Sequence, residues 1–289
     1  MKKPLVKREF GSIKSYTEEQ KLTPFLKWAG GKSQLLVQMK SHFPTKFERY
    51  YEPFLGGGAV FFHLLPEKAT LADSNDELMN VYRVIQKEAD EVMSALDEHH
   101  IHRRNKEYYY RIRALDPAEM SIVERAARTV FLNKTCYNGL YRVNSKGKFN
   151  VPFGKYKNPT LYKRDNILSV STALKGKALK TADYRDICEE ARKGDFIYLD
   201  PPYQPLSKTA SFTSYTKEAF GEKEQEELAS VFMKLDKRRC RVMLSNSSTS
   251  LIRSLYDGYH IESMKATRAI NCKASGRKAI EELLIMNYG

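Results

Sequence analysis

Four consecutive residues, Asp200-Pro201-Pro202-Tyr203, bring a carboxylate, a stiff backbone and an aromatic ring together. The apolar run at 196–199 precedes them, so the carboxylate is expected at the carboxyl end of a buried strand, where open α/β sheets bind ligands. Two prolines fix the turn and lack N–H groups, which leaves the Pro201 carbonyl as an acceptor beside the carboxylate. Two acceptors next to a ring suit an amino group on a flat molecule. A strand-ending turn with a core Tyr is the alternative, and the full tetrad in this context argues against it.

The glycine-rich segment 51–58 is a second candidate site. Gly56, Gly57 and Gly58 lie directly after an expected strand and before an expected helix, where a cofactor can approach the backbone closely. Their spacing is not G-x-G-x-x-G, so a nicotinamide cofactor is disfavoured. Asp73 ends the next strand and could accept hydrogen bonds from a ribose, although a lone Asp there more often caps a helix or forms a turn.

The segment 28–33, with the sequence WAGGKS, invites comparison with a phosphate-binding P-loop. That motif needs a glycine at position 26, where this chain has Leu26. No clear strand precedes the segment, so the sequence does not support an ATPase.

The positive charge of the chain is concentrated in one stretch. The 289 residues contain 49 Lys and Arg against 35 Asp and Glu, and a net +11 of the total +14 lies between residues 101 and 164. Within it, 134–164 has no acid and contains six aromatic rings: Tyr137, Tyr141, Phe149, Phe153, Tyr156 and Tyr162. A charge run usually means a solvated face, but cations interleaved with flat rings favour a nucleic acid partner.

Strands and helices alternate on both sides of this basic stretch. Strands are expected at 49–54, 69–73, 178–182, 195–199, 241–245, 259–264 and 282–288. Helices are expected at 59–65, at 106–114, 121–134, 184–192, 222–235 and 248–256, and from Asn75, which can cap it, to 85. Such alternation predicts an α/β fold with a largely parallel sheet, interrupted by an inserted helical block at about 85–165.

Composition excludes several classes of protein. No apolar run approaches the roughly 20 residues that a membrane span needs, and the basic N-terminus lacks the apolar core of a secretory signal, so a cytoplasmic location is expected. Cysteines stand alone, far apart, which disfavours zinc sites and disulfides and predicts small buried side chains: Cys136, Cys188, Cys240 and Cys272. No metal is expected.

Five motifs in order give the chain a family resemblance. They are FLKWAGGK at 25–32, EPFLGGG at 52–58, ADSN at 72–75, YNGLYRVN at 137–144 running on to FNVPFG at 149–154, and DPPY at 200–203. Together they resemble the DNA adenine methyltransferase (Dam) family over roughly residues 24–288. About the first 20 residues lie outside the resemblance and are expected to form a flexible arm.

The resemblance implies an enzyme that methylates N6 of adenine in double-stranded DNA with S-adenosylmethionine. It implies a Rossmann-like methyltransferase sheet from residues 1–84 and 166–289, with a mainly helical DNA-recognition domain at 85–165. A monomer is favoured. Nothing in the sequence separates roles in repair, gene control and protection against a nuclease.

Family positions map onto this chain residue by residue. The resemblance assigns the cofactor to Trp28, Lys32, Glu52, Phe54, Gly56, Gly57, Gly58, Asp73 and Asp200, and the chemistry to Asp200, Pro201, Pro202 and Tyr203. It assigns DNA contacts to Lys27, Tyr137, Asn138, Leu140, Arg142, Asn144 and Pro152, which favours GATC as the target. Tyr141 and Val143, on either side of Arg142, depart from the family pattern, which bears on the outer bases.

A base inside a duplex cannot present N6 to a buried methyl donor, so a flipped adenine stacked on Tyr203 is expected. Hydrogen bonds from N6 to Asp200 and Pro201 would aim the lone pair for direct transfer, with no Cys nucleophile. Arg142 can donate two hydrogen bonds to a guanine edge. Two alternatives stay open: methylation of an amide or amino group in protein or RNA, which Asp at position 200 and the basic insertion disfavour, and a protein that binds DNA without catalysis.

Overall fold

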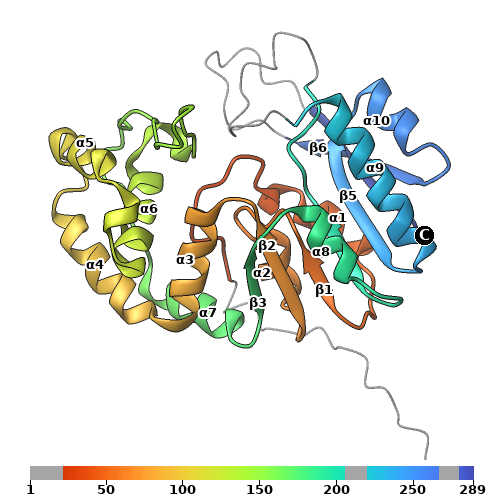
Figure 1. The fold of residues 1–289 in the computed structure, drawn as a ribbon, viewed down its shortest axis with the longest axis horizontal. Coiled ribbons are helices and arrows are strands. Elements are labelled where there is room, and N and C mark those ends of the chain that lie inside the picture. The colour runs from red at the N-terminus through yellow and green to blue at the C-terminus, as the bar shows by residue number, and fades with distance from the viewer. Residues whose placement is uncertain (1–21, 206–219, 267–279) are drawn as a thin grey trace, which may run out of the picture.

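The structure is a computed structural model that describes residues 22–205, 220–266 and 280–289 (Figure 1). The expected N-terminal arm and Cys272 lie outside the described residues. Cys136, Cys188 and Cys240 are buried free thiols, as their isolated positions predicted. None of the described helices is long and apolar enough to cross a membrane.

Seven strands of the described chain form one mixed sheet in the order β3-β2-β1-β4-β5-β7-β6. They are β1 (Tyr50–Glu52), β2 (Ala69–Asp73), β3 (Ala178–Thr181), β4 (Phe196–Leu199), β5 (Arg241–Ser247), β6 (His260–Ala266) and β7 (Ile280–Met286). The first five in this order are parallel, and β7 pairs antiparallel with both β5 and β6. The α/β fold class with a largely parallel sheet is therefore confirmed.

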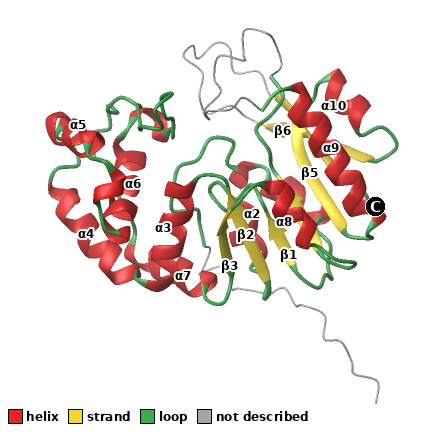
Figure 2. Ribbon diagram, viewed as in Figure 1, coloured by secondary structure: helices red, strands yellow, loops and turns green. Residues whose placement is uncertain are grey.

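The central strand β4 is apolar on both faces because helices cover both sides of the sheet. Phe196 and Tyr198 pack into one hydrophobic cluster, whereas Ile197 and Leu199 pack into another. The first cluster includes residues of α2 (Ala59–Leu64), α3 (Asp76–Lys87) and α7 (Arg164–Leu174), and the second includes α8 (Tyr184–Glu190), α9 (Glu222–Lys237) and α10 (Ser250–Leu255) (Figure 2). This layering aligns the carboxyl ends of neighbouring strands along one edge.

A helical block projects from one side of the sheet (Figure 1). It contains α4 (Ala89–Ile101), α5 (Lys106–Ala114) and α6 (Ile122–Thr135). Helices α4 and α7 were not predicted from the sequence, although α4 buries Ala89, Val92, Met93 and Leu96, whose spacing is helical. Short helical turns complete the described chain: η2 (Lys32–Gln34), α1 (Leu36–Met39), η3 (Lys40–His42), η4 (Pro117–Glu119) and η5 (Tyr137–Gly139).

Polar caps fix where the helices begin. Asn75 accepts a hydrogen bond from Leu78 N at 3.1 Å, which confirms the predicted cap of α3. Ser121 and Glu124 form a capping box at the start of α6.

Two of the cations in the basic stretch hold the block together rather than facing solvent. Arg128 is buried and donates to the carbonyls of Ile112 and Arg113 at the end of α5. Arg125 on α6 contacts Glu77 at 2.5 Å and Asp76 at 3.0 Å, both on α3. The block is thus fastened to the first turn of a helix that also covers the sheet.

Candidate active site

Three carboxyl groups lie at the carboxyl ends of adjacent strands. Glu52 ends β1, Asp73 ends β2 and Asp200 directly follows β4, and β1 lies between the other two in the sheet. The register pairs Tyr50 with Ala69 on one side and Phe196 on the other, which keeps these ends level. This is the edge at which open α/β sheets bind ligands.

Asp200 has one close counterion. Lys32 Nζ lies 2.7 Å from Asp200 Oδ1 and also donates to the Gly30 carbonyl at 2.7 Å. Its side chain is 4% exposed and that of Asp200 is 20% exposed. Ser245 Oγ donates to the same carboxylate oxygen at 3.3 Å and contacts Tyr198 OH at 2.6 Å. Burial raises the pKa of Asp200, while the charge of Lys32 opposes that rise.

The backbone after Asp200 is held by side chains from β5 and α9. Gln225 Nε2 donates to the Pro202 carbonyl at 3.0 Å, and its Oε1 accepts from Asn246 Nδ2 at 2.9 Å. Asn246 Oδ1 accepts from Gln204 N at 3.2 Å. Among the described residues, none donates a hydrogen bond to the Pro201 carbonyl.

The Tyr203 side chain is fixed at two points. Its hydroxyl donates to Glu282 Oε2 at 2.7 Å, and Lys32 Nζ lies over its ring, 4.7 Å from the centroid. The ring is half-buried beside Asp200. The tetrad thus presents a carboxylate, a carbonyl and an aromatic ring within one short turn.

The glycine loop packs under Trp28. Gly56 has a φ of +49°, and a Cβ there would lie 2.8 Å from Trp28 Cδ1, so a larger residue cannot be accommodated. Gly56 N donates to Asp73 Oδ2 at 3.0 Å, and Asn75 N donates to Asp73 Oδ1 at 3.0 Å. Tyr82 OH donates to the Gly56 carbonyl at 3.0 Å. Asp73 therefore shapes the loop as well as lying at the strand end.

Glu52 is a buried carboxyl, only 2% exposed, beneath the glycine loop. Burial raises its pKa from 4.5 to about 8, although hydrogen bonds from Tyr50 OH at 2.8 Å and from the Phe61 backbone act against that rise. Phe54, after the same strand, stacks on Tyr184 with ring centroids 5.1 Å apart. The contacts of Glu52 are therefore with β1 and α2, and that of Phe54 is with α8.

The site as a whole carries an excess of negative charge. The carboxylates of Asp200, Asp73 and Glu282 lie around the glycine loop and the tetrad, whereas Lys32 is the cation that pairs with Asp200. Glu52 adds a buried carboxyl group that keeps its proton near neutral pH. Such a site suits a ligand that is cationic or rich in hydroxyl and amino donors. Among the described residues there is no group of three or more His, Cys, Asp or Glu that could hold a metal ion.

A hairpin in the basic stretch presents Arg142. Val143 and Phe149 form an antiparallel bridge, and Asn150 Oδ1 accepts from Arg142 Nε at 2.7 Å. The guanidinium is exposed, and the Asn150 contact fixes its direction. Asn144, also exposed, shapes the hairpin tip, because its Oδ1 accepts from the backbone N–H groups of residues 146 and 148.

Lys27 is held against the helical block through its backbone. Asn133 Oδ1 accepts from Lys27 N at 2.9 Å, and Asn133 Nδ2 donates to the Lys27 carbonyl at 2.7 Å. Lys27 Nζ lies 3.9 Å from the centroid of the Tyr156 ring. Gly139, at a φ of +65°, lies against the Lys27 side chain so closely that a Cβ would be 2.4 Å from Lys27 Cδ. Burial, reinforced by Lys27, lowers the pKa of Lys134 to about 8.

The remaining predicted DNA contacts lie next to Lys27 and Arg142 in the fold. Tyr137 is 46% exposed and its N–H donates to the Pro152 carbonyl at 2.8 Å, which brings these two side by side. Asn138 is exposed at a φ of 55°, and Leu140 is half-buried against the core. These residues form one surface around η5.

One aromatic contact joins this surface to the glycine loop. Trp28 stacks on Tyr141 with ring centroids 5.4 Å apart and an interplanar angle of 27°. Tyr141, which departs from the family pattern, therefore contacts Trp28, a predicted cofactor-binding residue.

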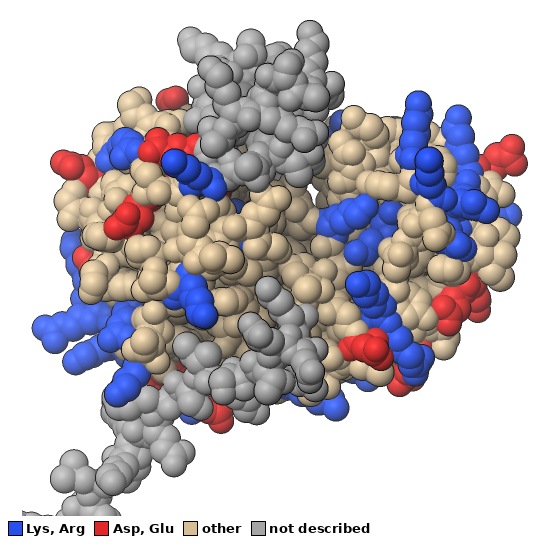
Figure 3. All heavy atoms as spheres, turned by 180° about the vertical axis from the view of Figure 1, so that it is seen from behind, with Lys and Arg blue, Asp and Glu red and all other residues tan. Residues whose placement is uncertain are grey.

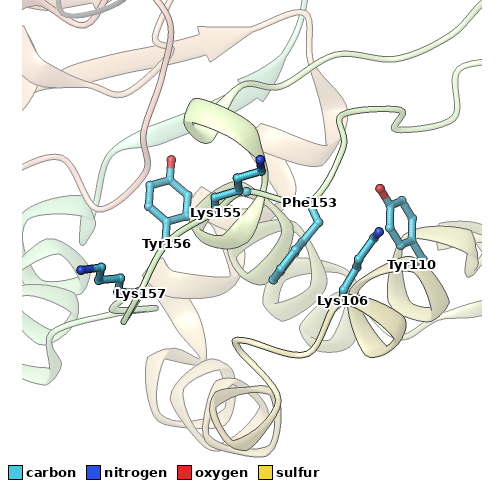
Figure 4. Close-up of a pocket in the computed structure, with 7 residues that line it drawn as sticks. Lys106, Tyr110, Phe153, Lys155, Tyr156 and Lys157 are labelled. Atoms are coloured by element: carbon cyan, nitrogen blue, oxygen red, sulfur yellow. The ribbon is translucent and has the colours of Figure 1, made fainter.

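Seen from behind, Lys and Arg side chains gather on the side of the molecule that carries the helical block (Figure 3). Part of this charge lines a cavity of about 450 Å³ between α5 and the segment 153–157. Its lining alternates cations and rings: Lys106, Tyr110, Phe153, Gly154, Lys155, Tyr156 and Lys157 (Figure 4). Tyr156 also contacts Lys27, so the cavity borders the surface around η5.

Sequence reasoning missed several residues that hold this site. Glu282 and Ser245 reach the tetrad from strands that follow it in the chain, and Asn133 clamps Lys27 from inside α6. A polar residue within an expected apolar strand is a usable signal for Ser245. Asn133 lies on a helical face otherwise occupied by buried residues, which is a similar signal.

Comparison with known proteins gives a consistent set of relatives. The family model of D12 class N6 adenine-specific DNA methyltransferases matches residues 28–270. The type II methyltransferase M1.LlaDCHI of Lactococcus lactis subsp. cremoris is 44% identical, over 93% of this chain and 96% of the relative. The type II methyltransferase M.MjaIII of Methanocaldococcus jannaschii is 45% identical, over 92% and 99%. The DNA adenine methylase of Escherichia coli K12 is 36% identical, over 91% and 94%.

Proposed function

Because the chain belongs to the D12 class N6 adenine-specific DNA methyltransferases, we propose that it methylates N6 of adenine in double-stranded DNA, within GATC. The observation that carries the proposal is the tetrad at the end of β4. Asp200 and the Pro201 carbonyl place two acceptors beside the Tyr203 ring, which matches the amino group and flat ring system of adenine.

S-adenosylmethionine is the proposed methyl donor, and the residues at the strand ends fit this cofactor. When bound, it supplies a methyl group on a positively charged sulfur. The excess of carboxyl groups at the strand ends favours such a cation. The residues proposed to hold it are Trp28, Lys32, Glu52, Phe54, Gly56, Gly57, Gly58, Asp73 and Asp200.

Asp200 and Pro201 are proposed to orient the reacting nitrogen. The lone pair of the adenine amino group is delocalised into the ring, so the nitrogen is a poor nucleophile. Hydrogen bonds from N6 to the carboxylate and the carbonyl favour a pyramidal nitrogen and stabilise the positive charge that develops on it. Lys32 and Ser245 hold the carboxylate for this task, at 2.7 and 3.3 Å.

Tyr203 is proposed to stack on the target base. Adenine must leave the duplex to reach the tetrad, so we propose base flipping. The three described cysteines are not proposed as nucleophiles, since burial raises the pKa of Cys136 and of Cys188 to about 12 and that of Cys240 to about 11, which keeps these thiols protonated.

The block at residues 85–165 is proposed as the DNA-recognition domain, with 1–84 and 166–289 as the catalytic domain. Arg142, directed by Asn150, is proposed to read a guanine edge in the major groove, and Lys27 to contact the target beside it. Tyr137, Asn138, Leu140 and Pro152 are proposed to meet the bases or to fill the space left by the flipped one. Asn144 is proposed as a further DNA contact at the hairpin tip, where two backbone N–H groups hold its Oδ1.

Labelled S-adenosylmethionine and two duplexes test the proposal. One duplex contains GATC and the other a scrambled tetranucleotide, and nucleoside analysis locates the label. The expected result is N6-methyladenine in the GATC duplex alone. Equal labelling of both duplexes would contradict the preference for GATC, and no labelling of either duplex by protein that binds the cofactor would contradict DNA as the substrate.

A further inference from the structure

Glu282 lies outside the motifs of the tetrad and the glycine loop, yet its carboxylate reaches Tyr203. Tyr203 OH donates to Glu282 Oε2 at 2.7 Å, across 79 positions of sequence. Glu282 belongs to β7, whose register pairs it with Ser247 on β5 and Met264 on β6. The strand order thus brings a carboxylate from near the end of the chain to the tetrad.

The neighbouring Glu281 shows that this placement depends on the face of the strand. Successive side chains of a strand point to opposite faces. Glu281 is exposed and pairs with Ser248 Oγ at 2.8 Å and Arg253 at 3.5 Å. Glu282 is partly buried and points to the tetrad instead. The two glutamates form a natural matched pair for comparison.

The hydrogen bond of the Tyr203 hydroxyl sets the orientation of the ring, which the contacts to the neighbouring backbone leave undetermined. Gln225 and Asn246 fix the chain on either side of Tyr203, through the Pro202 carbonyl and Gln204 N. Those contacts set the position of Cα but not the rotation of the ring. An acceptor 2.7 Å from the hydroxyl fixes that rotation, because a phenol donor is directional.

We propose that Glu282 is a positioning residue for methyl transfer, which holds the Tyr203 ring in the orientation that stacks the target adenine. The inference rests on the proposed function and deepens it. Glu282 touches neither the reacting nitrogen nor the methyl group, and its effect passes through Tyr203. A shift of about 1 Å in a stacked base changes rates by about a hundredfold, so a single hydrogen bond at the ring edge has a measurable effect.

Single-turnover methylation of a GATC duplex with saturating labelled S-adenosylmethionine tests this inference. The variants are Glu282→Ala, Glu282→Gln, Tyr203→Phe, the double variant Tyr203→Phe with Glu282→Ala, and Glu281→Ala as the matched control. Glu282→Ala is expected to lower the transfer rate constant about 10- to 100-fold while the Kd for DNA stays within about twofold. Glu282→Gln keeps an acceptor for the hydroxyl and is expected within about threefold of wild type.

The double variant shows whether Glu282 acts through the tyrosine. Tyr203→Phe removes the same hydrogen bond and keeps the ring, so adding Glu282→Ala is expected to cause no further loss. Losses that multiply in the double variant, an unchanged rate in Glu282→Ala, or an equal loss in Glu281→Ala would each overturn the inference. Labelling of the duplex by wild-type protein shows that the proposed function holds, so that these results bear on Glu282 alone. No transfer by wild type would overturn both the proposed function and the inference about Glu282.

Discussion

Lys32 Nζ lies 2.7 Å from Asp200 Oδ1, and the same ammonium donates to the carbonyl of Gly30 at 2.7 Å. The lysine is therefore anchored to the loop that carries Trp28 while it neutralises the carboxylate of the tetrad. Its position over the Tyr203 ring adds a third contact. Loss of its charge acts directly on the ionisation of Asp200.

Lys32→Met is expected to shift the pH dependence of methylation toward higher pH. Burial raises the pKa of Asp200 and Lys32 lowers it, so without the lysine the carboxyl takes up its proton at higher pH. Below that pKa the rate falls about tenfold per pH unit, because only the carboxylate is proposed to be active. The transfer rate constant measured from pH 5.5 to 9 gives the position of the acid limb. Lys40→Met, at an exposed site, serves as control, and an acid limb unchanged in Lys32→Met contradicts the expectation.

Asp200→Ala is expected to remove methylation and to spare DNA binding. The substitution deletes the acceptor that stabilises developing charge on N6, a type of contact that contributes about 100- to 1,000-fold or more to rate. Transfer of label and fluorescence anisotropy with a GATC duplex measure the two properties separately. The exposed Asp186→Ala on α8 is the control. A comparable loss of DNA affinity in Asp200→Ala would show that the carboxylate binds DNA rather than orienting the base.

Arg142→Ala is expected to change base discrimination, whereas Lys157→Ala is expected to change overall DNA affinity. Arg142 is directed by Asn150, so its loss should reduce discrimination at one base pair by about 1–3 kcal/mol. Lys157 lines the basic cavity, so its loss should weaken binding to all duplexes alike and lower the salt slope of log Kd by about one. Competition binding with single-base variants of GATC at several salt concentrations distinguishes them. A uniform loss in Arg142→Ala would make it a phosphate contact.

Glu52→Gln is expected to change how stability depends on pH. Burial raises the pKa of Glu52 from 4.5 to about 8, so between these values the folded protein keeps a proton that the unfolded chain has released. Its contribution to the free energy of unfolding therefore falls as pH rises through this window, by up to about 1.4 kcal/mol per unit. Gln cannot ionise, so the variant should gain stability relative to wild type from pH 5 to pH 8.

Urea unfolding at pH 5, 6.5 and 8 measures this difference. Glu67→Gln, at an exposed position, is the control and should follow wild type throughout. Parallel curves for Glu52→Gln and wild type would mean that Glu52 ionises in the folded protein near its ordinary pKa.

The strand ends were predictable because burial leaves a local signature. The run 196–199 is apolar on both faces of β4 and stops at Asp200, and Ala69–Asp73 was predicted with its observed bounds. The starts of α3 and α6 were predictable at Asn75 and Ser121, because a capping side chain accepts a hydrogen bond from a backbone N–H only three residues later.

Contacts between distant segments were not predictable. Glu282 reaches Tyr203 only because β7 inserts antiparallel between β5 and β6, and nothing in the local pattern of 280–286 specifies that neighbour. The basic stretch was predicted as a charged surface, yet Arg125 and Arg128 serve the packing of α6 instead. Net charge counts side chains and carries no information about which of them are buried.

Lys27 and the helical block form one structural unit, although they are far apart in the sequence. Asn133 binds both the N–H and the carbonyl of Lys27 across 106 positions of sequence, and Gly139 leaves room for the lysine stem. Replacing only residues 85–165 of this chain would therefore remove Asn133 and leave Lys27 in place. Under the proposed function, a change of target requires a split cassette, in which the segment around Lys27 is exchanged together with α6 and the hairpin.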